Sequence, residues 1–195
     1  FVEMTPLTVV EAEEWERLWV RGGFPDSFLA HGDALSLKWR RDFIRTYVER
    51  DIPQLGPRVP AQVIARFWTM LAHGQGGLWN GARIAGSLGV TGPTAARYLD
   101  LMTDLLLVRQ LPPYLANVRK RLVKSPKVYV RDSGIVHALL ELRDRDGLLG
   151  HPVVGASWEG FVVEQLLAVC PEGIACGFYR TARGDELDLV LKHPR

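Results

Sequence analysis

Near the end of the chain, Leu187, Leu189 and Leu191 recur at every second position, with Glu186, Asp188, Val190 and Lys192 between and around them. A period of two is typical of a β-strand, so Glu186 and Asp188 are predicted to lie side by side on the opposite face. The apolar stretch 174–181 predicts the partner strand, and the turn between them contains Gly184, which can adopt a positive φ. We therefore expect an antiparallel hairpin that carries two adjacent carboxylates.

Farther upstream, the hydrophobic spacing changes to that of helices. The segment 60–73 has an apolar stripe that consists of Val63, Ile64, Phe67, Met70 and Leu71. A second, short helix follows and can be capped by Asn80. After a turn at Gly89, Thr91 or Thr94 can cap a third helix. The middle of the chain is therefore predicted to contain three successive helices.

Strands are predicted to follow these helices. The third helix is expected to run to about Val108, and the segments 110–115 and 128–130 are expected to form two strands around a basic segment, 117–124. Helix, short helix, turn, helix and strand pair is the order of elements in a winged helix. In that fold, the start of the third helix enters the major groove of DNA.

The first part of the chain is predicted to be helical. Thr8 and Glu11 have the spacing of a capping box, which predicts a helix that continues through Arg21. A second helix is predicted over about 35–52, and Pro53 is expected to end it.

These patterns predict a mainly helical α+β protein with three parts: a helical segment (1–59), a winged helix (60–134) and a smaller α/β domain (135–195). Apolar residues make up 47% of the chain and aromatic residues 9%, which is typical of globular proteins. No apolar run approaches the roughly 20 residues that a membrane-spanning helix needs. Cys170 and Cys176 are too few and too far from any histidine cluster to indicate a zinc site. We expect a cytoplasmic protein in which both thiols are reduced.

The net charge is only +2, but the charges are segregated along the chain. Residues 61–135 carry a net charge of +7, whereas 1–60 carry −2 and 136–195 carry −3. Seven basic residues and no acidic ones lie between Asp104 and Asp132: Arg109, Arg119, Lys120, Arg121, Lys124, Lys127 and Arg131. This segregation predicts an anionic partner for the middle segment.

DNA is the anionic partner that a winged helix favours. The candidate contacts lie at the start of the third helix and in the wing: Thr91, Thr94, Arg97, Arg119, Lys120, Arg121 and Lys124. The alternatives are that the threonines are only helix caps, that the basic segment is only a solvated loop, and that the wing contacts protein rather than DNA.

The paired carboxylates of the hairpin suggest metal chemistry. Hard cations such as Mg²⁺ bind through one or two carboxylates together with a substrate phosphate. The alternative is that Glu186 and Asp188 lie on the solvated side of an ordinary hairpin.

Three motifs in the second half of the chain resemble a known family: KVYVRDSG at 127–134, WEGFVVE at 158–164 and RTARGDELD at 180–188. The family consists of bacterial and archaeal AAA+ ATPases whose C-terminal domain is related to PD-(D/E)xK restriction-endonuclease-like nucleases. Shorter matches at 7–8 (LT), 21–25 (RGGFP) and 47–52 (YVERDI) resemble the lid region that follows the ATPase core in the same family. The resemblance therefore extends over nearly the whole chain.

This resemblance implies a role for individual residues. Glu159 corresponds to the helix carboxylate and Asp188 to the first strand ligand of a metal-dependent nuclease, with Glu186 beside it. The (D/E)xK pair of the next strand has no counterpart here, so the chain itself is expected to be an incomplete nuclease domain without activity.

For a whole protein of this family, the resemblance implies ATP and Mg²⁺ as cofactors. The chain itself contains no phosphate-binding loop motif. The implied partners are DNA, an upstream ATPase core and a second copy of the chain. The competing prediction is a non-catalytic module that mediates oligomerisation or protein binding.

Overall fold

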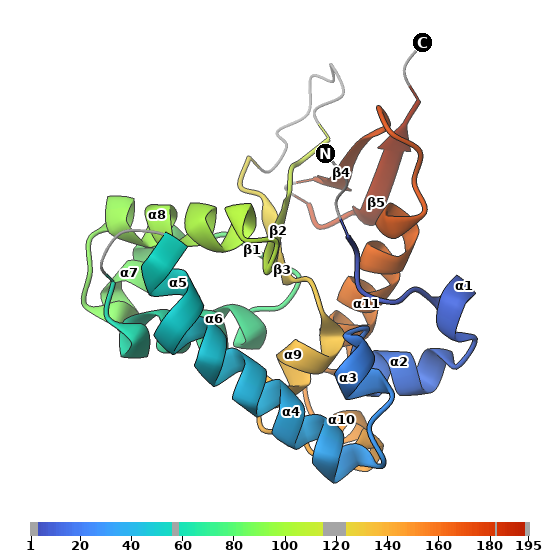
Figure 1. The fold of residues 1–195 in the computed structure, drawn as a ribbon. Coiled ribbons are helices and arrows are strands. Elements are labelled where there is room, and N and C mark those ends of the chain that lie inside the picture. Colours follow the sequence, from blue (N-terminus) through green and yellow to red (C-terminus); the bar gives the residue numbers. More distant parts are fainter. Residues whose placement is uncertain (1–3, 56–58, 115–123, 182, 194–195) are drawn as a thin grey trace.

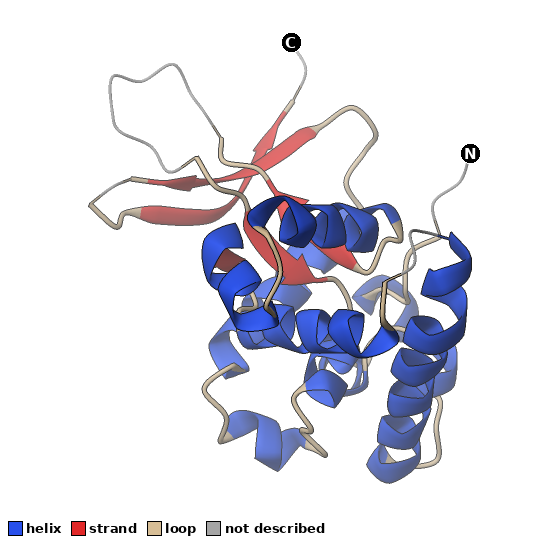
Figure 2. Ribbon diagram, turned by 90° about the vertical axis from the view of Figure 1, so that its left-hand side faces the viewer, coloured by secondary structure: helices blue, strands red, loops and turns tan. Residues whose placement is uncertain are grey.

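In the computed structural model of the protein, residues 4–55, 59–114, 124–181 and 183–193 are described. Helices form the body of the molecule, and two small antiparallel sheets lie at one side of it (Figures 1 and 2). The prediction of a mainly helical α+β fold is confirmed. Within the described ranges, no helix is both long enough and apolar enough to cross a membrane.

The N-terminal part contains α1 (Val9–Ala12), α2 (Trp15–Arg21), α3 (Pro25–Phe28), α4 (Asp33–Thr46), the π-helical turn η1 (Tyr47–Asp51) and α5 (Ile52–Leu55). The predicted capping box is confirmed, because Glu11 Oε2 accepts hydrogen bonds of 2.8 Å from both the backbone N–H and the hydroxyl of Thr8. A single helix through Arg21 is wrong. Glu13 has a left-handed φ of 55°, which ends α1, and a new helix begins at Trp15.

The predicted end of the next helix is also wrong. Helical structure continues from α4 through η1 into α5, so Pro53 does not end it. The π turn changes the backbone hydrogen-bond pattern just before Pro53. Pro53 then lies in the first turn of α5, where the missing N–H of proline is tolerated.

The middle part contains α6 (Ala61–His73), β1 (Gly77–Leu78), α7 (Gly81–Leu88), α8 (Gly92–Asp104), β2 (Val108–Leu111) and β3 (Lys127–Val130). β3 pairs antiparallel with both β1 and β2, so the strand order of the sheet is β1-β3-β2. The predicted order of helix, short helix, helix and strand pair is present, with an additional strand, β1, between α6 and α7, and the winged helix stays a prediction.

The caps of this region follow the sequence prediction. The Asn80 side chain accepts a hydrogen bond of 3.0 Å from the backbone N–H of Arg83 at the start of α7. Gly89 ends that helix with a left-handed φ of 69°. At the start of α8, Thr91 is the cap, and its hydroxyl accepts a hydrogen bond of 3.3 Å from the backbone N–H of Thr94.

The boundaries after α8 differ from the prediction. The helix ends at Asp104 rather than near Val108, because Leu106 has a left-handed φ of 59° that turns the chain into β2. β2 covers Val108–Leu111 rather than 110–115, and β3 begins one residue earlier than predicted, at Lys127.

The C-terminal part contains α9 (Ser133–Leu139), α10 (Arg145–Leu149), α11 (Val154–Ala168), β4 (Ala175–Arg180) and β5 (Glu186–Lys192). The predicted hairpin is confirmed: Ala175 lies opposite Lys192 and Arg180 opposite Glu186. Gly184 in its turn has a φ of 101°. The hairpin lies beside α11 (Figure 1), and two backbone hydrogen bonds join Phe178 to the chain after β2: Tyr114 N–H to Phe178 C=O and Phe178 N–H to Pro112 C=O.

One hydrophobic core extends through the predicted parts. Val48 of η1, Ile64 of α6, Val136 of α9 and Phe161 of α11 all belong to the same buried cluster. A smaller cluster, formed by Leu111, Tyr129 and Phe178, lies between the sheets. The three predicted parts therefore share one hydrophobic core. That they have separate functions stays a prediction.

Candidate functional site: a lysine held by three carboxylates

Strand β3 places one charged side chain inside the molecule. Its residues are buried on both faces of the sheet, with Val128 and Val130 in the main core and Tyr129 in the smaller cluster. Lys127 alternates with Val128 and so lies on the same face as Tyr129. The Lys127 side chain is only 3% exposed, and its ammonium lies 5.7 Å from the centre of the Phe178 ring. A lysine in this position requires acidic partners.

Three carboxylates supply them. The distances from Lys127 Nζ are 2.9 Å to Glu159 Oε1, 2.6 Å to Glu186 Oε1 and 2.8 Å to Asp188 Oδ1. Burial alone would lower the pKa of Lys127. The hydrogen bonds to Asp188, Glu186 and Glu159 outweigh burial and raise this pKa above its ordinary value, so the ammonium is charged at neutral pH.

Tyr129 adds a fourth contact to the cluster. Its hydroxyl donates a hydrogen bond of 2.5 Å to Glu159 Oε1. Burial raises the pKa of Tyr129, and the adjacent Glu159 raises it further, so the phenol stays protonated and remains a donor. Glu159 therefore accepts from two neighbours on the same face of β3.

A glycine allows α11 to come this close to the sheet. A Cβ atom at Gly160 would lie 2.5 Å from Gln75 Nε2 and 3.2 Å from Tyr129 Cδ1. Gln75 cannot move aside without loss, since its side chain donates to the Val130 carbonyl at 3.0 Å and accepts from the Val130 N–H at 2.8 Å. Gly160 thus brings Glu159, its neighbour in sequence, within reach of β3.

The structure brings together all three carboxylates named from the sequence. Glu186 and Asp188 lie side by side on β5 as predicted, and Glu159 reaches them from α11, but their common neighbour is an ammonium group. Across the described segments, no group of three or more Asp, Glu, His or Cys side chains is arranged to hold a metal ion. As they are placed, the residues fit the Lys127 ammonium rather than the Mg²⁺ that the resemblance implies.

A second ion cluster lies farther along α11. Glu164 Oε2 lies 2.8 Å from Arg109 Nη2 and 3.0 Å from Arg131 Nε. Three of the seven basic residues in the acid-free interval are therefore paired with carboxylates of the C-terminal part. Some of the basic residues that are segregated in the sequence therefore form ion pairs within the molecule.

The nucleic-acid candidates are separate from this cluster. Thr91, which caps α8, and Arg97 within that helix are exposed, whereas Thr94 is half-buried. Lys124 is exposed three residues before β3. Arg119, Lys120 and Arg121 lie outside the described residues. The same helix also exposes Asp100, whose carboxylate accepts a hydrogen bond of 3.3 Å from the Gln110 side chain.

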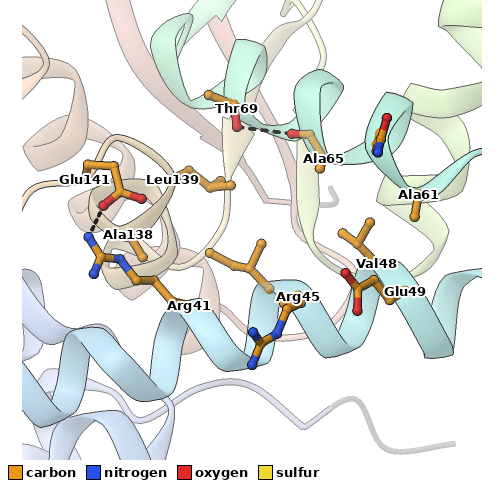
Figure 3. Close-up of a pocket in the computed structure, with 12 residues that line it drawn as sticks. Arg41, Arg45, Val48, Glu49, Ala61, Ala65, Thr69, Ala138, Leu139 and Glu141 are labelled. Carbon is orange, nitrogen blue, oxygen red and sulfur yellow. Dashed lines mark hydrogen bonds and ion pairs between the residues drawn. The ribbon is translucent and has the colours of Figure 1, made fainter.

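Two cavities lie apart from the Lys127 cluster, although Arg131 of the second ion cluster lines one of them. The first, about 320 Å³, is bordered by α4, η1, α6 and α9 (Figure 3). Its two arginines bind carboxylates of the chain, with Arg41 paired to Glu141 and Arg45 to Asp42. The second, about 500 Å³, has a mostly apolar lining that includes Trp68, whose buried indole N–H has no hydrogen-bond partner.

Sequence reasoning assigned no role to Lys127, Tyr129 or Glu164 in these clusters. No local pattern indicated the burial of Lys127, because a lysine that alternates with valines in a strand is normally predicted to face solvent. The excess of acidic residues after 136 indicated where the partner carboxylates lie.

Comparison with known proteins assigns the chain to a family without giving it a function. The chain belongs to the family described as Domain of unknown function (DUF8612), which matches residues 12–146. This range includes α6, α7, α8, the strands β1 to β3 and Lys127, but neither α11 nor β5.

The similar curated proteins are mycobacterial. The chain is 50% identical over 194 residues to the uncharacterized protein Rv2008c of Mycobacterium tuberculosis and to the uncharacterized protein Mb2031c of Mycobacterium bovis. Each alignment covers 98% of this chain and 44% of the relative, so the chain spans less than half the length of the curated relatives it matches. No solved structure matches the chain significantly.

Proposed function

We propose that this chain is the DNA-contacting C-terminal region of a cytoplasmic AAA+ ATPase, with ATP and Mg²⁺ bound by the ATPase core of the whole protein. The winged helix contacts the duplex, and the carboxylate cluster beside it is not a nuclease centre. The observation that supports this proposal most is the exposed N-terminal turn of α8, which is the second helix of a helix–turn–helix.

The chemistry of this turn suits a phosphate backbone. The positive end of the helix dipole lies at the start of α8, where the cap residue Thr91 is exposed. Arg97 is exposed in the second turn of the helix, and Lys124 is exposed where the chain enters β3. Basic groups at both places can contact the phosphates on the two sides of a groove.

Fluorescence anisotropy with a short labelled duplex over a range of salt concentrations tests the proposal. We expect binding that weakens steeply with salt, and a shallower slope in a variant in which Arg119, Lys120, Arg121 and Lys124 are alanine. The matched control replaces four exposed basic residues outside the winged helix: Lys38, Arg45, Arg50 and Arg143. Absence of binding at low salt, or the same slope in both variants, would refute DNA contact by the wing.

A second candidate function is protein binding, and an exposed aromatic patch favours it. Trp15 is 48% exposed and Trp158 is 39% exposed, with ring centroids 5.5 Å apart. Leu166 is exposed on the same helix as Trp158, and Val169 is exposed directly after that helix. Apolar surface of this kind is common at protein interfaces. Analytical ultracentrifugation of the wild type and of Trp15→Ser tests self-association. A monomer at every concentration would leave this patch without a role in oligomerisation.

A further inference from the structure

We infer that Lys127 is the resident cation of the carboxylate site: its ammonium takes the place of the divalent metal ion that the resemblance implies, and it fastens the C-terminal hairpin to the sheet of the winged helix. This inference concerns β3, α11 and β5, and it does not depend on whether the winged helix binds DNA.

The hydrogen-bonding capacity of the ammonium matches its surroundings. A lysine side chain has three N–H donors and no acceptor. Lys127 Nζ has one oxygen from each of Glu159, Glu186 and Asp188 between 2.6 and 2.9 Å away. Every donor therefore has a charged acceptor, and the nitrogen occupies the point at which the three carboxylates converge.

Lys127 cannot leave this point easily. Its side chain is 3% exposed. The residues around the stem belong to the cluster of Leu111, Tyr129 and Phe178, which are themselves fully buried. A metal ion that entered the site would have to displace a buried ammonium into apolar surroundings, which is unfavourable for an unpaired charge.

The charges of the cluster nearly balance without a metal. Three carboxylates face Lys127, and one of them, Glu186, is also paired with Arg180, whose Nη1 lies 3.4 Å from Glu186 Oε2. The five groups together carry a net charge of −1. Without the lysine charge, three carboxylates would face one arginine, and their oxygens are the ligands that hard divalent ions bind.

The inference predicts that removal of the lysine charge creates a cation site. Lys127→Met keeps most of the apolar stem and removes only the ammonium. Titration with Mn²⁺, followed by electron paramagnetic resonance and calorimetry, is expected to show binding at least about tenfold tighter to this variant than to the wild type. Lys124→Met removes an exposed positive charge from the same segment and serves as the matched control, with no gain in affinity.

Two further measurements make the test decisive. Lys127→Met with Asp188→Asn should lose the Mn²⁺ affinity that the single variant gains. The melting temperature of Lys127→Met should rise with Mn²⁺, whereas that of the wild type should not, since only a folded cation site links binding to stability. A folded Lys127→Met variant without a gain in Mn²⁺ affinity would overturn the inference.

The wild type alone gives an independent answer, even if Lys127→Met does not fold. We expect its Mn²⁺ affinity to be weak and unchanged by Asp188→Asn. Tight binding to the wild type that is lost on Asp188→Asn would show that the carboxylates hold a metal beside Lys127, and would also overturn the inference.

Discussion

The basic residues of the middle segment form two groups that look alike in the sequence and differ in use. Arg109, Lys127 and Arg131 lie against carboxylates of α11 and β5, whereas Arg97 and Lys124 are exposed. The first group lies in or directly after the strands β2 and β3, whereas Arg97 lies on α8 and Lys124 precedes β3. A run of like charges in a sequence therefore does not by itself predict a charged surface, because carboxylates elsewhere in the same chain can pair with those charges.

The strongest test of the difference between the two groups is to replace one buried lysine and one exposed lysine of the same segment. Lys127→Met is expected to lower the free energy of unfolding by about 3 kcal/mol, since three carboxylates then lose their common cation. Lys124→Met should change it by less than about 0.5 kcal/mol. Urea denaturation followed by tryptophan fluorescence measures both, and similar losses in the two variants would contradict the distinction.

A buried histidine tests whether interior polar groups govern stability. Burial lowers the pKa of His137 to about 4, with Arg40 and His151 acting in the same direction and the hydrogen bond to the Val20 carbonyl opposing them. An unfolded histidine titrates near pH 6.5, so between these values only the unfolded chain gains the proton. The His137 contribution is therefore complete above pH 6.5 and is lost as the pH falls, by about 1.4 kcal/mol per unit and about 3 kcal/mol in all.

The His137→Gln variant isolates this effect. Its stability should be lower than that of the wild type at pH 7 but should fall less steeply toward pH 4. Burial raises the pKa of Asp132, which acts in the opposite direction, but it does so in both proteins and cancels in the comparison. Urea denaturation across the pH range gives the slope of the unfolding free energy against pH for each protein. Equal slopes would show that His137 does not contribute to the pH dependence of stability.

The second ion cluster allows a weaker version of the first comparison. Glu164→Gln is expected to destabilise the protein by about 2 kcal/mol, because the largely buried Arg109 and Arg131 lose a shared carboxylate. Glu141→Gln breaks an exposed pair with Arg41 and should have little effect on stability. Thermal and urea unfolding of both variants check the difference. A larger loss in Glu141→Gln would reverse the order that burial predicts.

The smallest change in stability is expected on the exposed side. Arg97→Ala should leave the free energy of unfolding within about 0.5 kcal/mol of the wild type, yet reduce the slope of log affinity for duplex DNA against log salt by about 1. Arg143→Ala, an exposed arginine between α9 and α10, is the control and should change neither. An effect of Arg97→Ala on folding but not on the salt slope would place this residue in the first group.

Local patterns in the sequence predicted much of the fold. The alternation of Leu187, Leu189 and Leu191 with Gly184 in the turn was sufficient for the hairpin, and Asn80, Gly89 and Thr91 marked helix ends that the structure confirms. These features depend on residues within a few positions of one another.

The errors have a different cause. Glu13 and Leu106 adopt left-handed backbone conformations that their side chains do not favour, so packing elsewhere in the molecule must stabilise these turns. The Lys127 contacts were missed because their partners are distant, at 32 residues for Glu159 and 61 for Asp188. Leu187 is 60% exposed although it lies on the apolar face of its strand, so the pattern alone did not indicate which side of the hairpin would face the protein.

Hydrogen–deuterium exchange tests most directly whether the buried basic residues hold the C-terminal hairpin in place. In Lys127→Met, the amides of β4 and β5 should exchange faster than in the wild type, while those of α6 and α8 keep their protection, and Lys124→Met should match the wild type throughout. If β5 exchange is unchanged in Lys127→Met, or if the two variants behave alike, the lysine does not fasten the hairpin.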